Sequence, residues 1–168
     1  MFAKAIVMSA VVTFTITNAE GKEAMKYEVQ VQEVAAQPAL VVKGRVQIEK
    51  AGDAIGGNIG AVGAFLKAAH VQPAGAPFTR TYSFENGVLE FESGFRVAAS
   101  AKGKGDVIAT ELPKSKVATT FHVGDQTKSE DAYKAIHAWM AANGKQPAGA
   151  PWEVYESDTK MQIFFPIQ

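Results

Sequence analysis

The residues best suited to chemistry in this sequence are Glu153 and Tyr155, which stand two positions apart in Trp-Glu-Val-Tyr-Glu at 152–156. This segment is rich in aromatic residues and is predicted to be a strand. Alternate residues of a strand point to the same face, so the carboxylate and the phenol would lie about 7 Å apart along it. If that face lines a cleft, the carboxylate would pair with a bound cation or, buried without a partner, act as a general acid or base. If it faces water, Glu153 is a solvated strand residue.

A duplication indicates how the chain positions this pair. The hexapeptide Gln-Pro-Ala-Gly-Ala-Pro occurs at residues 72–77 and again at 146–151. Each copy follows a helix-like segment and precedes an aromatic residue and a strand-like segment. Two copies at this distance do not fit a solenoid, whose units are shorter and more numerous. They predict two similar half-domains, at about 26–97 and 106–168, which pack about a pseudo-twofold axis and leave a cleft suited to a ligand.

The alternation of apolar and polar residues gives both halves the same order of elements. Strands are expected at 27–33, 39–47, 78–84 and 88–97, and again at 106–112, 116–123, 152–156 and 161–167, with a hairpin turn at Asn86-Gly87. Helices are expected at 58–69, with Asn58 as the N-cap, and at 130–143. In outline, each half is a β-α-β-β unit. The fold class is therefore α+β, with an antiparallel-rich sheet, two helices on one of its faces and a cleft between the halves.

Glycines surround the start of the first expected helix. Gly52, Gly56 and Gly57 are expected to loosen the chain before it. Gly60 and Gly63 lie inside it, where each costs on the order of 1 kcal/mol, and they indicate close packing against the sheet or a nearby ligand. The cluster at 56–60 lacks the Gly-Lys-Ser/Thr ending of a phosphate-binding loop.

Composition excludes several classes of function. The 168 residues carry 17 Lys and Arg and 17 Asp and Glu, and they form no basic stripe of the kind that indicates a nucleic-acid surface. The absence of cysteine excludes disulfides and zinc–thiolate sites. His70, His122 and His137 do not have a metal-binding spacing. Neither a metal nor a cofactor is therefore expected, and nucleic acid is not an expected partner.

Residues 1–24 are interpreted as an N-terminal extension. Lys4 precedes an uncharged run, residues 5–17, that has features of a weak export signal but is too short to span a bilayer. Alternatively, the natural start is Met25 and the residues before it belong to an over-long gene start. We expect a cytoplasmic protein with one domain at 25–168 and no membrane span.

Several motifs resemble those of the GyrI-like small-molecule-binding family, which includes the effector-binding domains of MerR- and AraC-type multidrug regulators of bacteria. They are His122-Val123-Gly124 ahead of the second helix, the run from Gly149 to Tyr155, and the terminal Phe165-Pro166-Ile167. The double half-domain order is a further point of similarity. The resemblance covers about 26–168, outside any DNA-binding helices, and it implies a stand-alone member of the family.

The resemblance implies an aromatic cleft that holds one buried acid, in which family members bind lipophilic, often cationic, aromatic compounds. Glu153 is the expected acid and Tyr155 its neighbour in the site. The aromatic residues expected to line the cleft, each also compatible with a place in the core, are Trp139, Trp152, Phe65, Tyr82 and Phe91. Thr79 takes the place equivalent to Glu153 in the first half, so the acid occurs once and the site is expected to be asymmetric.

Three functions remain open from the sequence. The leading one is a binding module that captures a hydrophobic or cationic small molecule. The second is a hydrolase of strained, cyclopropane-containing toxic compounds, in which Glu153 activates water and Tyr155 positions the leaving group. The third is a protein-interaction role such as gyrase protection, with an unknown protein partner.

Overall fold

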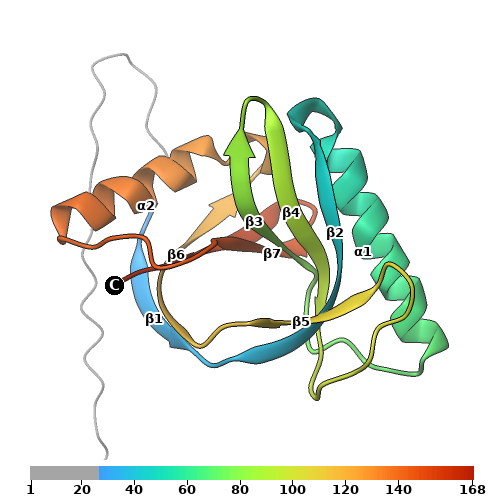
Figure 1. The fold of residues 1–168 in the computed structure, drawn as a ribbon. Coiled ribbons are helices and arrows are strands. Elements are labelled where there is room, and N and C mark those ends of the chain that lie inside the picture. The colour runs from blue at the N-terminus through green and yellow to red at the C-terminus, as the bar shows by residue number, and fades with distance from the viewer. Residues whose placement is uncertain (1–26) are drawn as a thin grey trace, which may run out of the picture.

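The computed structural model describes residues 27–168, and the expectations for residues 1–24 and for a start at Met25 lie outside this range. Figure 1 shows the arrangement of the elements within it. In chain order they are β1 (Gln30–Val34), β2 (Gln37–Gln47), η1 (Ile48–Lys50), α1 (Ala51–Ala68), β3 (Phe78–Glu85), β4 (Val88–Arg96), β5 (Ile108–Leu112), β6 (Ser115–Val123), η2 (Gln126–Lys128), α2 (Glu130–Ala142), β7 (Trp152–Ser157) and β8 (Lys160–Pro166).

The strands pair in one antiparallel sheet with the order β1-β6-β8-β7-β3-β4-β2-β5. If each of β1 to β4 is exchanged with its counterpart among β5 to β8, the same strand order is obtained when the sheet is read from the opposite edge. The chain therefore consists of two similar units about a pseudo-twofold axis, and the predicted α+β fold is confirmed. Each unit has two strands before its helix, one more than the β-α-β-β outline. At the centre β3 pairs with β7, and Thr79 lies opposite Glu153.

The repeated hexapeptide makes equivalent contacts in both units at this centre. The backbone N–H of Tyr155 donates to the carbonyl of Pro77 at 3.0 Å, and that of Thr81 donates to the carbonyl of Pro151 at 3.1 Å. The two bonds are related by the same shift along the chain as the two hexapeptides. The final proline of each copy thus joins its own unit to the other one, next to Glu153.

Both helices lie on the face of the sheet to which Glu153 points. α2 packs on β6 and β8, where Ile136 and Met140 are buried, and α1 packs on β2 and β4, where Val62 and Leu66 are buried. Tyr133 of α2 hydrogen-bonds to Glu153, which places α2 on the Glu153 side. α1 borders the cleft into which the same carboxylate opens. The expected placement of two helices on one face is confirmed.

The start of α1 differs from the prediction. The helix begins at Ala51 instead of residue 58, so Asn58 is not an N-cap but lies mid-helix, where its side-chain amide donates to the carbonyl of Val42 at 3.1 Å. Three glycines that were expected to loosen the chain lie inside the helix. Ala51 and Ile55 extend the apolar stripe backwards through them, and this packing outweighs a cost on the order of 1 kcal/mol for each glycine.

Two local predictions are confirmed. Asn86 and Gly87 have φ values of 51° and 76°, as the two central residues of a type I′ hairpin turn require. α2 spans Glu130–Ala142 against the predicted 130–143, and it ends before Gly144, whose φ of 60° is that of a left-handed helix stop.

The sheet is strongly curved, and its face opposite the helices is concave. Arg80 of β3 donates to Thr110 Oγ1 at 3.2 Å and to the carbonyl of Glu111 at 3.1 Å, both in the edge strand β5. In a flat sheet β3 and β5 would lie three strand spacings apart, about 14 Å, which is beyond the reach of an arginine. The sheet therefore bends around this face, whose core includes Trp152 and Phe78. The curl is visible in Figure 1, where β5 crosses below β3 and β4.

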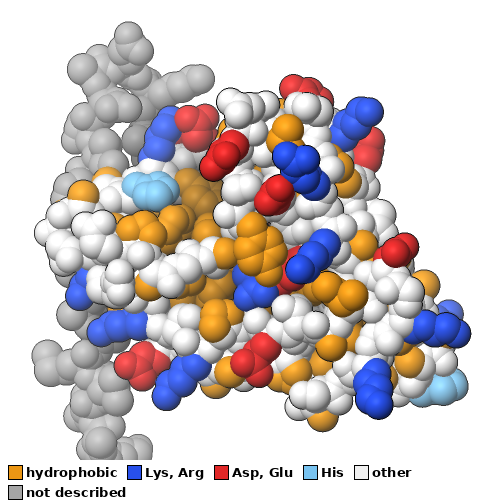
Figure 2. Space-filling model, in the orientation of Figure 1, with side chains coloured by type: hydrophobic (Ala, Val, Ile, Leu, Met, Phe, Trp, Pro, Cys, Tyr) orange, Lys and Arg blue, Asp and Glu red, His pale blue; other side chains and the backbone are white. Residues whose placement is uncertain are grey.

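Charge and hydropathy agree with the composition. On the face that Figure 2 displays, positive and negative side chains are interspersed, and hydrophobic side chains gather in a central hollow. In the described part of the chain, neither helix combines the length and the hydropathy needed to cross a bilayer.

Candidate functional site

A cleft of about 610 Å³ opens between the N-terminal half of α1 and the centre of the sheet. The helical wall comes from η1 and α1 and consists of Ile48, Ala51, Gly52, Ile55, Gly56 and Ile59. The strand wall comes from β7 and β8 and includes Glu153, Tyr155 and Met161, and Gln126, Thr127 and Asp158 stand at one end. This volume lies within the range of small-molecule sites in proteins, about 300–1,000 Å³.

Both oxygens of the Glu153 carboxylate accept a hydrogen bond from a tyrosine. Tyr133 Oη donates to Oε1 at 2.6 Å, and Tyr155 Oη donates to Oε2 at 2.8 Å. One donor comes from α2 and the other from the same strand, two residues on. The two bonds fix the carboxylate in one orientation, because a side chain held at both oxygens has no rotational freedom left to lose when a ligand binds.

The charge of this carboxylate has no counter-ion among residues 27–168. None of the ion pairs of the described chain includes Glu153. Among residues 27–168, the cleft is lined by two acidic residues, Glu153 and Asp158, and by no lysine or arginine. Hydroxyl donors satisfy the oxygens of a carboxylate without neutralising it. The cleft therefore offers an oriented negative charge beside an apolar helical wall.

The two tyrosines are held in the neutral form. Burial raises the pKa of Tyr133 and of Tyr155 well above the usual value of 10, and the nearby Glu153 charge raises it further in both. In the unfolded chain both phenols ionise near pH 10. The folded state therefore keeps protons that the unfolded state loses above pH 10, and stability falls as the pH rises through that range. Below pH 10 these two groups leave the stability independent of pH.

Removing one of these phenols should weaken the alkaline loss of stability. We expect the free energy of unfolding of Tyr133→Phe to fall less steeply above pH 10 than that of the wild type, by up to about 1.4 kcal/mol per pH unit. Urea titrations between pH 8 and pH 11 measure this slope. Equal slopes in the two proteins would show that Tyr133 ionises as readily folded as unfolded.

None of the five aromatic residues predicted to line the cleft borders it, although three of them lie on its side of the sheet. Trp139 is buried in the core under α2, and Phe65 packs under α1 against β2 and β4, so both are on the Glu153 side but neither borders the cleft. Phe91 is also on this side, yet it is only 1% exposed, and its ring occupies the space beside Gly44 of β2. Trp139 packs in the same cluster as Met161 and Phe91 in the same cluster as Ala51, so these two side chains lie behind residues of the cleft wall.

Two other predicted residues lie on the opposite face, which corrects the prediction for them. Trp152 is adjacent to Glu153 in β7, and strand alternation turns it the other way, where it stacks on Phe164 at 5.4 Å. Tyr82 falls at a register shift in β3 and lies over the guanidinium of Arg80 at 5.2 Å. Neither side chain reaches the cleft.

The structure adds residues that the sequence analysis did not place in the site. Tyr133 was not among the predicted site residues. Gly52, Ile55 and Gly56 precede the start assigned to the first helix, and Ile59 lies within the predicted helix but was not assigned to the site. A helical period carried back to Ala51 would have placed both isoleucines on one face of α1.

The comparisons with known proteins agree with this architecture. The family model described as the GyrI-like small molecule binding domain matches residues 27–168. The chain belongs to this family. No curated protein sequence matches the chain significantly.

Solved structures with the GyrI-like fold include EcmrR, SAV2435 and a hydrolase from Listeria innocua. The chain matches EcmrR in a DNA complex with a TM-score of 0.71 and 19% identity over 84% of this chain, and it spans 57% of that one. The EcmrR C-terminal domain gives 0.68 and 21%, over 86% and 99% of the two chains. SAV2435 bound to tetraphenylphosphonium gives 0.58 and 16%, over 86% and 94%. The hydrolase gives 0.58 and 15%, over 83% and 91%.

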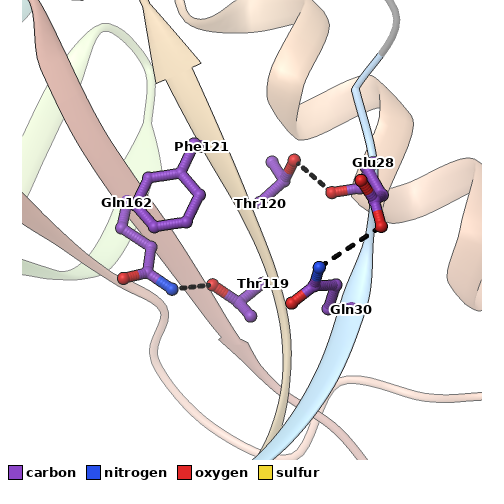
Figure 3. Close-up of a pocket in the computed structure, with 6 residues that line it drawn as sticks. All are labelled: Glu28, Gln30, Thr119, Thr120, Phe121 and Gln162. Carbon is purple, nitrogen blue, oxygen red and sulfur yellow. Dashed lines mark hydrogen bonds between the residues drawn. The ribbon is translucent and has the colours of Figure 1, made fainter. Parts of the chain in front are cut away.

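A second, smaller pocket lies at the edge of this GyrI-like domain, where β1 leaves β6 (Figure 3). It measures about 220 Å³, and five of its six lining residues are polar. Gln162 donates to Thr119 at 3.0 Å, Thr120 donates to the carbonyl of Glu28 at 2.7 Å, and Gln30 donates to the Glu28 carboxylate at 3.3 Å. Since these groups already satisfy one another, we place no ligand there.

The histidine of the family-like motif has a structural role in this chain. His122 is buried, with Nε2 2.9 Å from the carbonyl of Asp125 and Nδ1 2.8 Å from the hydroxyl of Tyr27. Because a carbonyl can only accept, Nε2 carries a proton, and Nδ1 shares the second hydrogen bond with the phenol. Both nitrogens are thus occupied. Within residues 27–168 no cluster of His, Asp and Glu is arranged to hold a metal ion.

Proposed function

We propose that this chain binds lipophilic aromatic cations in the cleft between α1 and β7, with Glu153 as the counter-charge. The observation that carries the proposal is the Glu153 carboxylate, held by two tyrosine hydroxyls and paired with no cation in the described chain. A partly buried charge without an ion pair is costly, and a bound cation would relieve that cost. A neutral ligand would leave the charge of Glu153 unpaired and would not relieve this cost.

The remainder of the cleft supports a lipophilic ligand. Ile48, Ile55 and Ile59 contribute to the apolar part of the helical wall, and Ile48 is 43% exposed. Covering such surfaces removes apolar area from water, which contributes about 25 cal/mol per Å². The phenol ring of Tyr155, which lines the cleft, would add attraction between its π face and a nearby cation.

One similar protein supports the class of ligand. SAV2435, which shares the fold at 16% identity, has been solved with tetraphenylphosphonium, a lipophilic aromatic cation. At this identity the likeness concerns the fold alone, so the argument for this chain depends on its own carboxylate and its own apolar wall.

Isothermal titration calorimetry with tetraphenylphosphonium tests the proposal. We expect saturable binding to the wild type and at least a tenfold weaker Kd for Glu153→Gln, which corresponds to about 1.4 kcal/mol or more. The neutral triphenylphosphine oxide should bind both proteins with similar affinity. Glu156→Gln is the matched control, since it makes the same change in the same strand at a residue already paired with Lys160.

Equal affinity of the wild type and Glu153→Gln for the phosphonium would exclude Glu153 as the counter-charge. Equal weakening by Glu156→Gln would show that the cation responds to overall charge rather than to the cleft. No saturable binding to the wild type would exclude the proposed ligand class.

Hydrolysis is a second candidate, favoured by the phenol and carboxylate that meet in the cleft. A fold relative described as a hydrolase from Listeria innocua belongs to the same structural group. Each oxygen of Glu153 accepts one tyrosine hydroxyl and keeps a second lone pair, with which it would accept a proton from water. Mass spectrometry of a cyclopropane-containing electrophile incubated with the wild type and with Glu153→Gln would decide it. A hydrolysed product formed by the wild type alone would establish turnover.

A further inference from the structure

The helix that borders the cleft contains five glycines. They are Gly52, Gly56, Gly57, Gly60 and Gly63, all inside Ala51–Ala68. Glycine in a helix interior loses more conformational entropy on folding than alanine does, so each position lowers the stability of α1. Five glycines together lower the stability of α1 considerably, and their presence therefore calls for a physical explanation.

Two usual reasons do not apply to most of these positions. None of the five has a positive φ, so backbone conformation does not require glycine. A Cβ added at Gly52, Gly56, Gly57 or Gly60 would meet no atom of the described chain within 4 Å, so close packing does not require it either. At Gly63 a Cβ would meet the ring of Phe95 at 3.7 Å, which is an ordinary contact. The close packing inferred from the sequence is therefore absent.

Two of the open positions differ from the others in what they face. Gly52 and Gly56, one helical turn apart, belong to the wall of the cleft opposite Glu153 and Tyr155, whereas Gly57 and Gly60 do not. Methyl groups at 52 and 56 would project into the cleft and narrow it. Between the isoleucines, the bare backbone forms a recess in the apolar wall.

We propose that Gly52 and Gly56 set the width of the cleft and so select ligands with several aromatic rings over small cations. This inference rests on the proposed function and adds a size filter to it. A multi-ring cation whose charge meets Glu153 must place a ring against the recess of α1. A cation with one ring meets Glu153 without reaching that wall. The loss of helix stability at these glycines is then a consequence of keeping the recess open.

Neighbouring glycines provide a matched test. Gly56→Ala and Gly57→Ala make the same change at adjacent positions of one helix, both with open space for the methyl group, and both should raise the melting temperature by a few degrees. We expect Gly56→Ala and Gly52→Ala each to weaken the Kd for tetraphenylphosphonium by at least tenfold in calorimetry, and Gly57→Ala to leave it unchanged. Phenyltrimethylammonium, a one-ring cation, should bind all four proteins equally.

The outcomes separate this inference from the proposed function. Unchanged affinity of both Gly52→Ala and Gly56→Ala for tetraphenylphosphonium, with a wild type that binds it through Glu153, would overturn the size filter alone. Equal weakening by Gly57→Ala would also overturn it, since that methyl group does not enter the cleft. A wild type that binds neither cation would overturn both. Increased thermal stability of the variants excludes misfolding as the cause of lost binding.

Discussion

Replacing Arg80 by leucine is expected to lower the free energy of unfolding by about 3–5 kcal/mol, because it leaves a buried charge without its partner. Glu92 is fully buried in the middle of β4, and its Oε1 accepts from Arg80 Nε at 2.8 Å. Its second oxygen has no hydrogen-bond partner in the described chain. Arg80 also reaches Thr110, so the same substitution removes the polar bonds between β3 and the edge strand β5.

Urea unfolding followed by circular dichroism measures this loss, and the sheet provides a matched control. Arg45→Leu removes the other arginine–glutamate pair of the sheet, Arg45 with Glu90, whose side chains are 71% and 46% exposed. An exposed pair of this kind contributes only about 0–1 kcal/mol. A loss for Arg80→Leu no larger than for Arg45→Leu would contradict the account of a buried, uncompensated carboxylate.

The double variant Arg80→Leu/Glu92→Leu separates the charge from the packing. If the cost arises from the unpaired carboxylate, removing it restores about 2 kcal/mol or more relative to Arg80→Leu alone, since apolar replacements of a buried pair are often tolerated. If the double variant is less stable than the single one, the bonds to β5 and the packing of Glu92 carry the stability instead.

Much of the fold could be predicted because its signals are local. The repeated hexapeptide, the Asn86-Gly87 turn and the alternation within the strands each depend on a few neighbouring residues. The start of α1 at Ala51 was mispredicted for the opposite reason. Glycines lower local helix propensity, and tertiary packing of the stripe that includes Ile55 overrides it, a contribution that propensity does not contain.

Strand periodicity predicted the part of the site that lies on a single strand. A period of two places Glu153 and Tyr155 on one face, and the structure joins them by a hydrogen bond of 2.8 Å. The same period excludes Trp152, which the family resemblance had brought into the predicted cleft. Tyr133 was not assigned to the site, because its contact with Glu153 depends on how α2 crosses the sheet, and helical spacing does not determine that crossing.

The sequence also did not reveal that Gly94 has the least space for a side chain among the glycines of the strands, and an added methyl group there is expected to cost about 3 kcal/mol or more of stability. Gly94 pairs with Val41 of β2 and with Phe78 of β3. A Cβ there would overlap the carbonyl oxygen of Leu40 and approach Val41 Cα to 2.9 Å. Overpacking against side chains typically costs about 1–3 kcal/mol, and backbone atoms of a paired strand have less freedom to move away.

Gly94→Ala is compared with Gly63→Ala in the same urea titration. A Cβ at Gly63 would only touch the ring of Phe95 at 3.7 Å, so this control should gain stability, by up to about 1 kcal/mol. The first variant should also change the site, because Ser93, next to Gly94, hydrogen-bonds to Thr79 at 2.8 Å, and Thr79 lies opposite Glu153. A displaced β4 would shift β3 and with it the central pair. If Gly94→Ala is as stable as the wild type, β2 moves away from the added methyl group at little cost. If it also binds the phosphonium with wild-type affinity, the position of β4 does not determine the geometry around Glu153.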